Sequence, residues 1–331
     1  MNTYKVLILA FLLVLPLQGI AQIKDKAGTS GFQFLKIGVG ARETALAEAT
    51  TAVVEGPASI YWNIAGLANT NTVSALFFHN PWIASIRHSF IAISVPVSDG
   101  RTIGAAVTLL NMDDMEETTI ENPEGTGRHF GAGDFAASFS YAQQISDQLA
   151  AGVAVKYVNE YIWDLVTDGW AFDIGLQYKI DRFSLGMALK DFGTNKMIGG
   201  NQLEDYQKIY EDWETSSVLV GLVPKEIRLP VSFHFGAAYE VLSGEDHRLL
   251  TMANMVYFND IGEVQNVGVE YTFLSSFVLR GGYRFNRDTF SFTGGIGLKT
   301  SIESTILQLN FATMQMKDFG YRTQFDIAIS L

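Results

Sequence analysis

The sequence contains no cysteine, so it offers no disulfide framework, no thiolate metal site and no lipoprotein anchor. Charged residues are also scarce, at 18% of 331 residues, against about 25% in a typical soluble domain. Hydrophobic residues reach 48% and aromatic residues 12%. The formal net charge of −12 lacks the basic excess that neutralises phosphates, and this argues against a nucleic-acid partner.

Long apolar runs are missing as well. After the N-terminus, no segment supplies the roughly 18 apolar residues that a membrane helix needs. At the start of the chain, Lys5 precedes a short apolar run from Val6 to Leu17, and Gly19-Ile20-Ala21 supplies the small residues that a signal peptidase reads. We therefore expect residues 1–21 to be a cleaved signal peptide. In a membrane, the exported chain would have to form a β-barrel.

Catalytic and metal-binding motifs are absent from the sequence. The five histidines are scattered, with no H-E-x-x-H, and no G-x-S-x-G elbow occurs. Gly38-Val39-Gly40 lacks the third glycine and the preceding strand of a dinucleotide fingerprint. The sequence therefore predicts no enzyme, no cofactor and no metal site.

Nearly everything after Asn71 alternates apolar and polar residues with period two. The clearest unit is Trp170–Ile180 followed by Phe183–Lys190, with Asp181-Arg182 as a tight turn between them. Strict alternation over about ten residues per strand is typical of a membrane barrel. A soluble β-sandwich with one buried face would alternate in the same way, so alternation alone leaves both folds open.

Further features favour the barrel. The polar faces are dominated by Gly, Ala and Ser, which leave room inside a lumen. Outer-membrane barrels have short periplasmic turns and longer outer loops. Connections alternate in the same way here, with the long ones including Asp113–Gly133, Asn159–Gly169 and Gly193–Leu229. The last strand, Tyr321–Leu331, ends on a large apolar residue, which resembles the signal by which such barrels are recognised for assembly.

We therefore predict an all-β fold, a transmembrane antiparallel β-barrel of about 14 strands over residues 71–331. The segment Leu249–Phe258 alternates poorly and leaves the count open by two strands. Residues 22–70 lack this alternation. The apolar residues of Ala41–Val54 have helical spacing, and Gly56-Pro57 is expected to end the helix. This small helical segment is expected to plug the lumen, the alternative being an amphipathic helix packed outside a sandwich.

Parts of this N-terminal segment resemble the opening of the PorV/PorQ family of bacterial outer-membrane proteins. The matching residues are Ala27-Gly28-Thr29-Ser30, Phe34-Leu35-Lys36-Ile37-Gly38-Val39-Gly40-Ala41-Arg42, Tyr61-Trp62-Asn63 and Ala65-Gly66-Leu67. The family is similar in architecture to the FadL fatty-acid transporters. The resemblance implies a FadL-like barrel in the cell outer membrane, in contact with outer-membrane lipid.

The resemblance implies two different functions. In the first, which the opening motif favours, the protein is an accessory or shuttle component of type IX secretion. It would bind the C-terminal domains of secreted cargo beside a translocon, through outer loops that carry Tyr206, Tyr210 and Trp213. In the second, the protein takes up hydrophobic small molecules through a plugged lumen. A pocket for such a hydrophobic ligand would then be lined by Phe32, Phe34 and Leu35.

Isolated charges fall on the polar faces of the predicted strands, and the plug adds more. We expect these charges to pair with one another inside the lumen, because burying an unpaired charge is costly. The alternative is a polar binding site or a latch on the plug. The residues of this predicted network are Arg42, Asp173, Lys179, Glu240, Glu270, Arg280, Arg284, Arg322 and Asp326.

Overall fold

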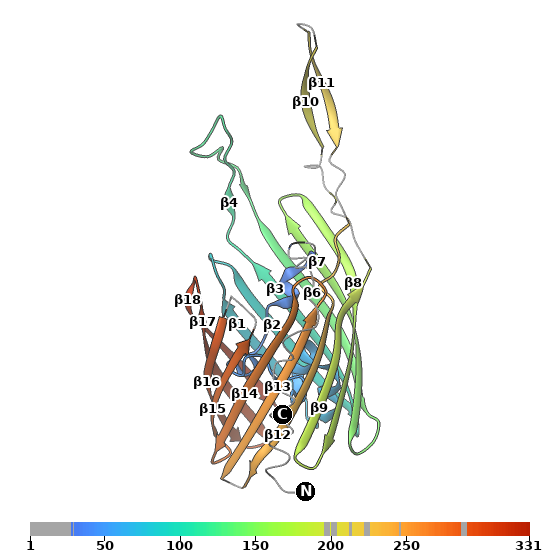
Figure 1. The fold of residues 1–331 in the computed structure, drawn as a ribbon, viewed down its shortest axis with the longest axis vertical. Helices are drawn as coiled ribbons and strands as arrows, with labels where there is room; N and C mark the ends of the chain where they lie inside the picture. The colour runs from blue at the N-terminus through green and yellow to red at the C-terminus, as the bar shows by residue number, and fades with distance from the viewer. Residues whose placement is uncertain are drawn as a thin grey trace.

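The protein is a closed β-barrel of 14 antiparallel strands (Figure 1). The computed structural model describes residues 28, 30–194, 199, 204–211, 214–221, 226–244, 246–285 and 290–331. Strand β1 pairs with β18, so the sheet closes on itself. Closure is what a bilayer requires, because each backbone polar group in lipid must be paired within the protein. The predicted fold class and strand count are confirmed.

The wall is built from strands in an order that departs from the chain order only where two small hairpins are inserted. The barrel strands are β1 (Ser74–Pro81), β2 (Arg87–Ser98), β3 (Arg101–Asn111), β6 (Ala132–Gln144), β7 (Leu149–Ile162), β8 (Leu165–Ile180), β9 (Phe183–Gly193), β12 (Ser232–Ser243), β13 (His247–Phe258), β14 (Gly262–Phe273), β15 (Phe277–Phe285), β16 (Phe290–Ile302), β17 (Thr305–Met316) and β18 (Gly320–Ser330). The inserted hairpin strands are β4 (Met115–Glu116), β5 (His129–Phe130), β10 (Glu204–Glu211) and β11 (Glu214–Gly221).

The connections differ between the two ends of the barrel. One end carries short turns, such as Asp181-Arg182 between β8 and β9. The other end carries the β4–β5 and β10–β11 segments, which project beyond the rim in Figure 1. We call these the inner and the outer end, since short turns are periplasmic in such barrels. The predicted long connection Asn159–Gly169 is wrong, because β7 and β8 extend through it and leave only Trp163-Asp164 between them.

The two faces of the wall have opposite character. On β8, Phe172 and Ile174 point outward and are 52% exposed each, whereas Asp173 between them is 2% exposed. An outward apolar band is the lipid-facing surface of a membrane barrel. Strand β13 alternates poorly in sequence because its lumen face is apolar too: Leu250 and Met252 are buried in a cluster with plug residues.

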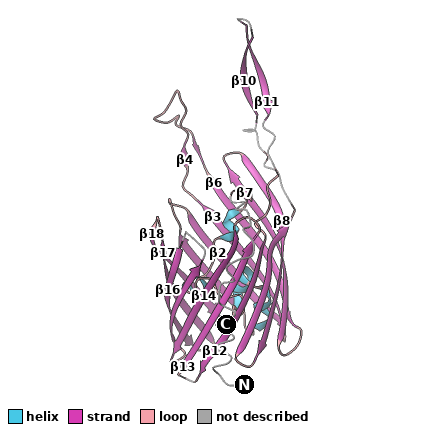
Figure 2. Cartoon of the chain, in the orientation of Figure 1, coloured by secondary structure: helices cyan, strands magenta, loops and turns pink. Residues whose placement is uncertain are grey.

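The N-terminal segment lies inside the barrel, where Figure 2 shows its short helices. The predicted single helix over Ala41–Val54 is wrong. It ends at Ala45, because Ala47 and Glu48 take positive φ values of 52° and 65° and turn the chain. The segment is a chain of single turns: η1 (Gln33–Lys36), α2 (Ala41–Ala45), η2 (Gly56–Ala58), α3 (Ser59–Trp62) and η3 (Ile64–Asn69). No helix among the described residues is long and apolar enough to cross a membrane.

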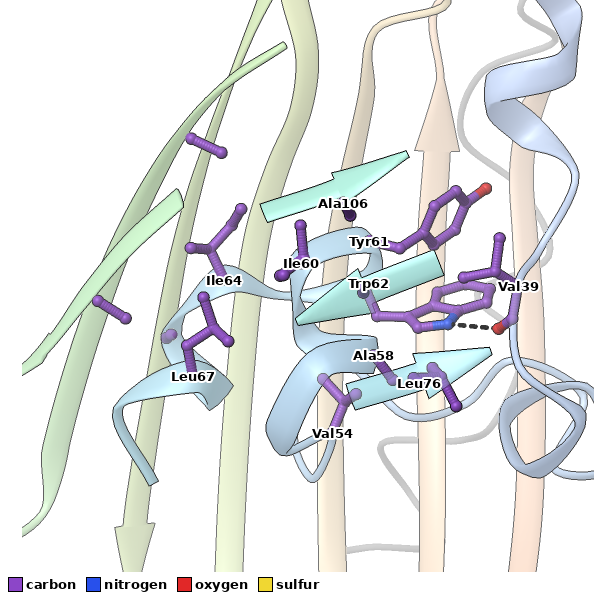
Figure 3. Close-up of a cluster of buried hydrophobic side chains, with 14 of the residues drawn as sticks. Val39, Val54, Ala58, Ile60, Tyr61, Trp62, Ile64, Leu67, Leu76 and Ala106 are labelled. Carbon is purple, nitrogen blue, oxygen red and sulfur yellow. Dashed lines mark hydrogen bonds between the residues drawn. The ribbon is translucent and has the colours of Figure 1, made fainter. Parts of the chain in front are cut away.

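We call residues 30–70 the plug, and its side chains form the main core of the molecule (Figure 3). Trp62 is 2% exposed, and its indole Nε1–H donates to the carbonyl of Val39 at 2.9 Å. The hydroxyl of Tyr61 donates to the carbonyl of Leu35 at 2.8 Å. These two bonds fold the plug back on itself, and they satisfy two of its buried backbone carbonyls while its apolar side chains contact the wall.

A belt of glycines on the lumen face of the wall receives the plug. At each position an added Cβ would lie within about 3 Å of a plug atom, closer than van der Waals contact allows. Three cross-strand pairs in the belt consist of two glycines each. The belt consists of Gly104, Gly152, Gly175, Gly186, Gly236, Gly268, Gly282 and Gly295.

Replacing Gly282 by Ala is expected to destabilise the barrel, because the added Cβ would lie 2.6 Å from the backbone nitrogen of Ala47. Overpacking of this kind costs about 1–3 kcal/mol. The neighbouring, lipid-facing Gly281 provides the control, since a Cβ there meets nothing within 4 Å. Urea unfolding in lipid should give a lower midpoint for Gly282→Ala than for Gly281→Ala. Equal midpoints would contradict a close fit of the plug.

Candidate functional site

The middle of the plug is fixed by a buried charge network. Arg42 at the start of α2 makes a two-pronged contact with Glu270 of β14, at 2.9 Å and 3.1 Å. Arg280 of β15 donates to the same carboxylate at 2.7 Å. Asp326 of β18 accepts the backbone N–H of Ala41 at 2.5 Å. Arg42 and Arg280 therefore share the carboxylate of Glu270. The carboxylate of Asp326 binds the first turn of α2, where the exposed backbone N–H groups favour a negative charge.

A second buried network lies on the opposite wall. Lys156 of β7 bridges Asp173 of β8 at 3.0 Å and Asp191 of β9 at 2.5 Å. The ammonium of Lys190 lies 3.7 Å from the ring centroid of Tyr61, a cation–π contact between the wall and α3. The first network holds the plug through buried ion pairs, whereas the second joins three wall strands and contacts the plug through Lys190. Removing one partner of a buried ion pair is costly.

The outer end of the plug is tied to the loops. The backbone N–H of Gly31 donates to the carbonyl of Arg228 at 3.0 Å. Lys36 donates to Asp260, in the turn between β13 and β14, at 2.6 Å. Burial acts to raise the pKa of Asp260, but the hydrogen bonds from Lys36 and Gln33 outweigh it and hold this pKa below its usual value. The carboxylate is therefore ionised and paired at neutral pH.

An apolar pocket of about 290 Å³ opens at the outer end, beside the plug. Leu110, Ile162, Leu165 and Ile227 give it a hydrocarbon surface, and Leu110 and Ile227 also pack against the outer part of the plug. Five residues with polar side chains interrupt that surface: Asn111, Asp134, Glu160, Tyr161 and Thr167. We call this cavity the outer pocket; it is lined by Ile86, Leu110, Asn111, Met112, Ala132, Gly133, Asp134, Glu160, Tyr161, Ile162, Leu165, Thr167 and Ile227.

A larger cavity of about 840 Å³ lies at the inner end. Its lining is mainly polar and includes Arg42 and Glu55 of the plug, Lys179, Glu240 and Arg248. Between the plug and the wall, beside Tyr61 and Lys190, a small cavity has a volume of about 20 Å³, which suffices for about one water molecule. The plug thus separates an apolar outer pocket from a polar inner cavity.

The residues predicted to line a ligand pocket are packed into a core. Phe32, Phe34 and Leu35 are 0%, 2% and 4% exposed. They form a cluster with Val158 and Leu229, among others, and only Leu35 borders the small cavity. The outer pocket lies next to this cluster, on the far side of Leu110 and Ile227.

The predicted lumen charges all lie on the plug or on lumen-facing positions. Arg42, Asp173, Glu270, Arg280 and Asp326 belong to the two buried networks described above. The other four residues are not part of those networks. Lys179 and Glu240 line the inner cavity, and Arg284 forms an ion pair with Glu48 of the plug. Arg322 lies on the same face of β18 as Asp326.

Two of the three predicted partner-binding residues lie in the outer hairpin. Tyr206 and Tyr210 belong to β10, and Trp213 lies outside the described residues. Among the described residues, no group of His, Asp and Glu side chains is arranged to hold a metal ion.

Sequence reasoning missed Asp134, Glu160 and Thr167 of the outer pocket. Asp134 and Glu160 have the same parity as the lumen-facing residues of β6 and β7. Had the two strands been extended to their true ends, that parity would have placed both carboxylates inside the barrel.

No protein-family model matches this sequence, and no curated protein matches it either. Solved structures do. The toluene transporter TodX of Pseudomonas putida has a TM-score of 0.57 at 12% identity, covering 88% of this chain and 97% of that one. The fold is similar to that of TodX. The monoaromatic hydrocarbon channel CymD has a TM-score of 0.50 at 13% identity, covering 88% and 96%. A FadL homologue from Pseudomonas aeruginosa scores 0.49 at 10% identity, covering 89% and 97%. The chain therefore shares its barrel fold with TodX and CymD.

Replacing Glu270 by Gln should strongly destabilise the seated plug. The substitution leaves Arg42 and Arg280 buried against a neutral amide, and breaking a buried pair costs about 3–5 kcal/mol. Glu240→Gln is the control, because its partner Arg248 has a side chain that is 47% exposed, and such pairs contribute about 0–1 kcal/mol. Urea unfolding should separate the two variants clearly. A similar loss in both would contradict the assignment of Glu270 as an anchor of the plug.

Proposed function

We propose that this protein takes up hydrophobic small molecules across the outer membrane. The observation that carries the proposal is the outer pocket, a cavity of about 290 Å³ with mainly apolar walls beside the plug. Small-molecule sites are typically concave and apolar, with a few polar groups that fix orientation. The similarity in fold to TodX and CymD supports a channel over an enzyme.

Uptake through this barrel would be gated by the plug. Its belt of close contacts and its two charge networks leave a cavity of only about 20 Å³ beside Tyr61 and Lys190. A molecule in the outer pocket reaches the inner cavity only if the plug or a strand beside it shifts. The outer pocket would therefore capture the molecule first, and a conformational step would release it.

Membership of the PorV/PorQ family, with a role in type IX secretion, is the second candidate. The opening residues of the plug support it, and so does the β10–β11 hairpin, which projects beyond the rim in Figure 1. An exposed hairpin offers a surface for a protein partner. The outer pocket, however, has no part in this candidate, so uptake remains the main proposal.

Filling the outer pocket should abolish uptake. Leu165→Trp adds an indole to the pocket, whereas Leu279→Trp adds one on the lipid-facing surface, where Leu279 is 59% exposed. Cells of a strain without other hydrocarbon channels would be given radiolabelled toluene or radiolabelled benzylamine. Uptake of either probe that depends on the protein should be lost with Leu165→Trp and kept with Leu279→Trp. If neither probe enters faster than in cells without the protein, the uptake proposal fails.

Deleting the hairpin from Glu204 to Gly221 tests the secretion candidate separately. A tagged full chain would be purified from its own outer membranes in mild detergent, and bound proteins identified by mass spectrometry. The candidate predicts secreted proteins that share a C-terminal domain, and their loss on deletion, while the barrel still folds. A full chain that captures no secreted protein contradicts it.

A further inference from the structure

We propose that the outer pocket selects a small apolar molecule that carries a protonated amine, in preference to a neutral hydrocarbon. This inference rests on the proposed uptake function and specifies its substrate class. The structurally similar proteins TodX and CymD are a toluene transporter and a monoaromatic hydrocarbon channel. The pocket of this chain contains charged groups for which such hydrocarbons offer no partner.

Three polar residues of the outer pocket form one row across three strands. Asp134 of β6 is directly paired with Glu160 of β7, and Glu160 is directly paired with Thr167 of β8. Leu110 of β3 is paired with Asp134 on the other side. Directly paired residues have Cβ atoms about 5 Å apart. Two carboxylates and a hydroxyl therefore stand side by side, bordered by a leucine.

The side chains of this row lack some of the hydrogen-bond partners that they could have. One oxygen of Glu160 accepts the backbone N–H of Phe32 at 2.7 Å, which ties the carboxylate to the plug. The side chain of Asp134 makes no hydrogen bond or ion pair within the part of the chain that the structure describes. Thr167 is 5% exposed, and its Oγ1 has no hydrogen-bond partner. A buried hydroxyl without a partner is costly, so the site is prepared for a polar group that a ligand supplies.

The charge of that group follows from electrostatics. Like charges on directly paired positions of neighbouring strands repel one another. Two basic side chains of the outer segments, Arg87 and Arg128, are paired with Asp113 and Glu117 and so do not neutralise the row. An ammonium group has three donors and no acceptor, so it can satisfy Asp134, Glu160 and the Thr167 hydroxyl together. A neutral hydrocarbon would instead bury the carboxylates without a partner.

The size of the pocket limits the rest of the molecule. An apolar cavity of about 150 Å³ holds benzene, and the outer pocket has about 290 Å³. A single ring with a short aminoalkyl chain fits this volume. The ring would lie against Leu110, Ile162 and Leu165, and the ammonium would face the polar row.

The test measures binding of two ligands of matched shape to the full chain in lipid nanodiscs. Phenethylamine is a cation at pH 7.5, and n-propylbenzene replaces its ammonium by a methyl group. Isothermal titration calorimetry would be run for both, with empty nanodiscs subtracted to remove partitioning into lipid. The proposal predicts that phenethylamine binds at least about tenfold more tightly, the difference of one well-placed charged contact.

Three variants show whether the preference comes from the polar row. Asp134→Asn and Glu160→Gln should each weaken phenethylamine binding about tenfold and leave n-propylbenzene binding unchanged. The Gln side chain keeps an oxygen for the N–H of Phe32, so the tie to the plug remains. Glu263→Gln is the control, because Glu263 lies at the outer end of β14, away from the lining of the outer pocket.

Each alternative outcome overturns the proposal. If n-propylbenzene binds as tightly as phenethylamine, the pocket does not select a cation, although uptake of hydrocarbons would still stand. If Glu263→Gln weakens phenethylamine as much as Asp134→Asn does, the preference comes from overall charge and not from the row. If neither ligand binds, the inference fails, and the uptake measurement with toluene and benzylamine decides the proposed function independently.

Discussion

The close approach of the plug backbone to the glycines of the wall is the constraint on which the rest of the structure depends. At Gly186, a Cβ would lie 2.2 Å from the carbonyl oxygen of Thr51, and at Gly175 it would lie 2.2 Å from the side-chain oxygen of Asn63. Because side chains are missing there, a segment of single turns can fill a lumen that 14 strands would otherwise leave open. The apolar cluster around Trp62 and the charge networks around Glu270 and Lys156 form only when this fit is made.

The seated plug divides the lumen into two chemically different compartments. The inner cavity is polar and borders Arg42, so it resembles an aqueous vestibule. The outer pocket is mainly apolar and contains the row of Asp134, Glu160 and Thr167. Because Glu160 also accepts the N–H of Phe32, the groups that would hold a ligand also hold the first residues of the plug. A ligand that drew Glu160 away would loosen this tie, which connects capture of the ligand with movement of the plug.

The barrel could be predicted from the sequence because period-two alternation maps directly onto lipid and lumen faces. Strand β13 is the exception, because its lumen-facing Leu250 and Met252 contact the plug, so that both faces are apolar and the pattern is blurred. The internal form of the plug could not be predicted: helical spacing over Ala41–Val54 indicates one helix, but Ala47 and Glu48 turn to follow the wall. The outer pocket also escaped prediction, because the neighbourhood of Asp134, Glu160 and Thr167 is a property of strand register, which a single sequence does not specify.

The central claim is that the plug closes the lumen, and ion conductance tests it most directly. The full chain would be inserted into a planar lipid bilayer and compared with a chain that lacks residues 30–70, which the structure assigns to the plug. If the plug closes the lumen, the full chain should give no stable conductance steps and the shortened one should give large steps. Stable large steps from the full chain, equal to those of the shortened chain, would contradict it.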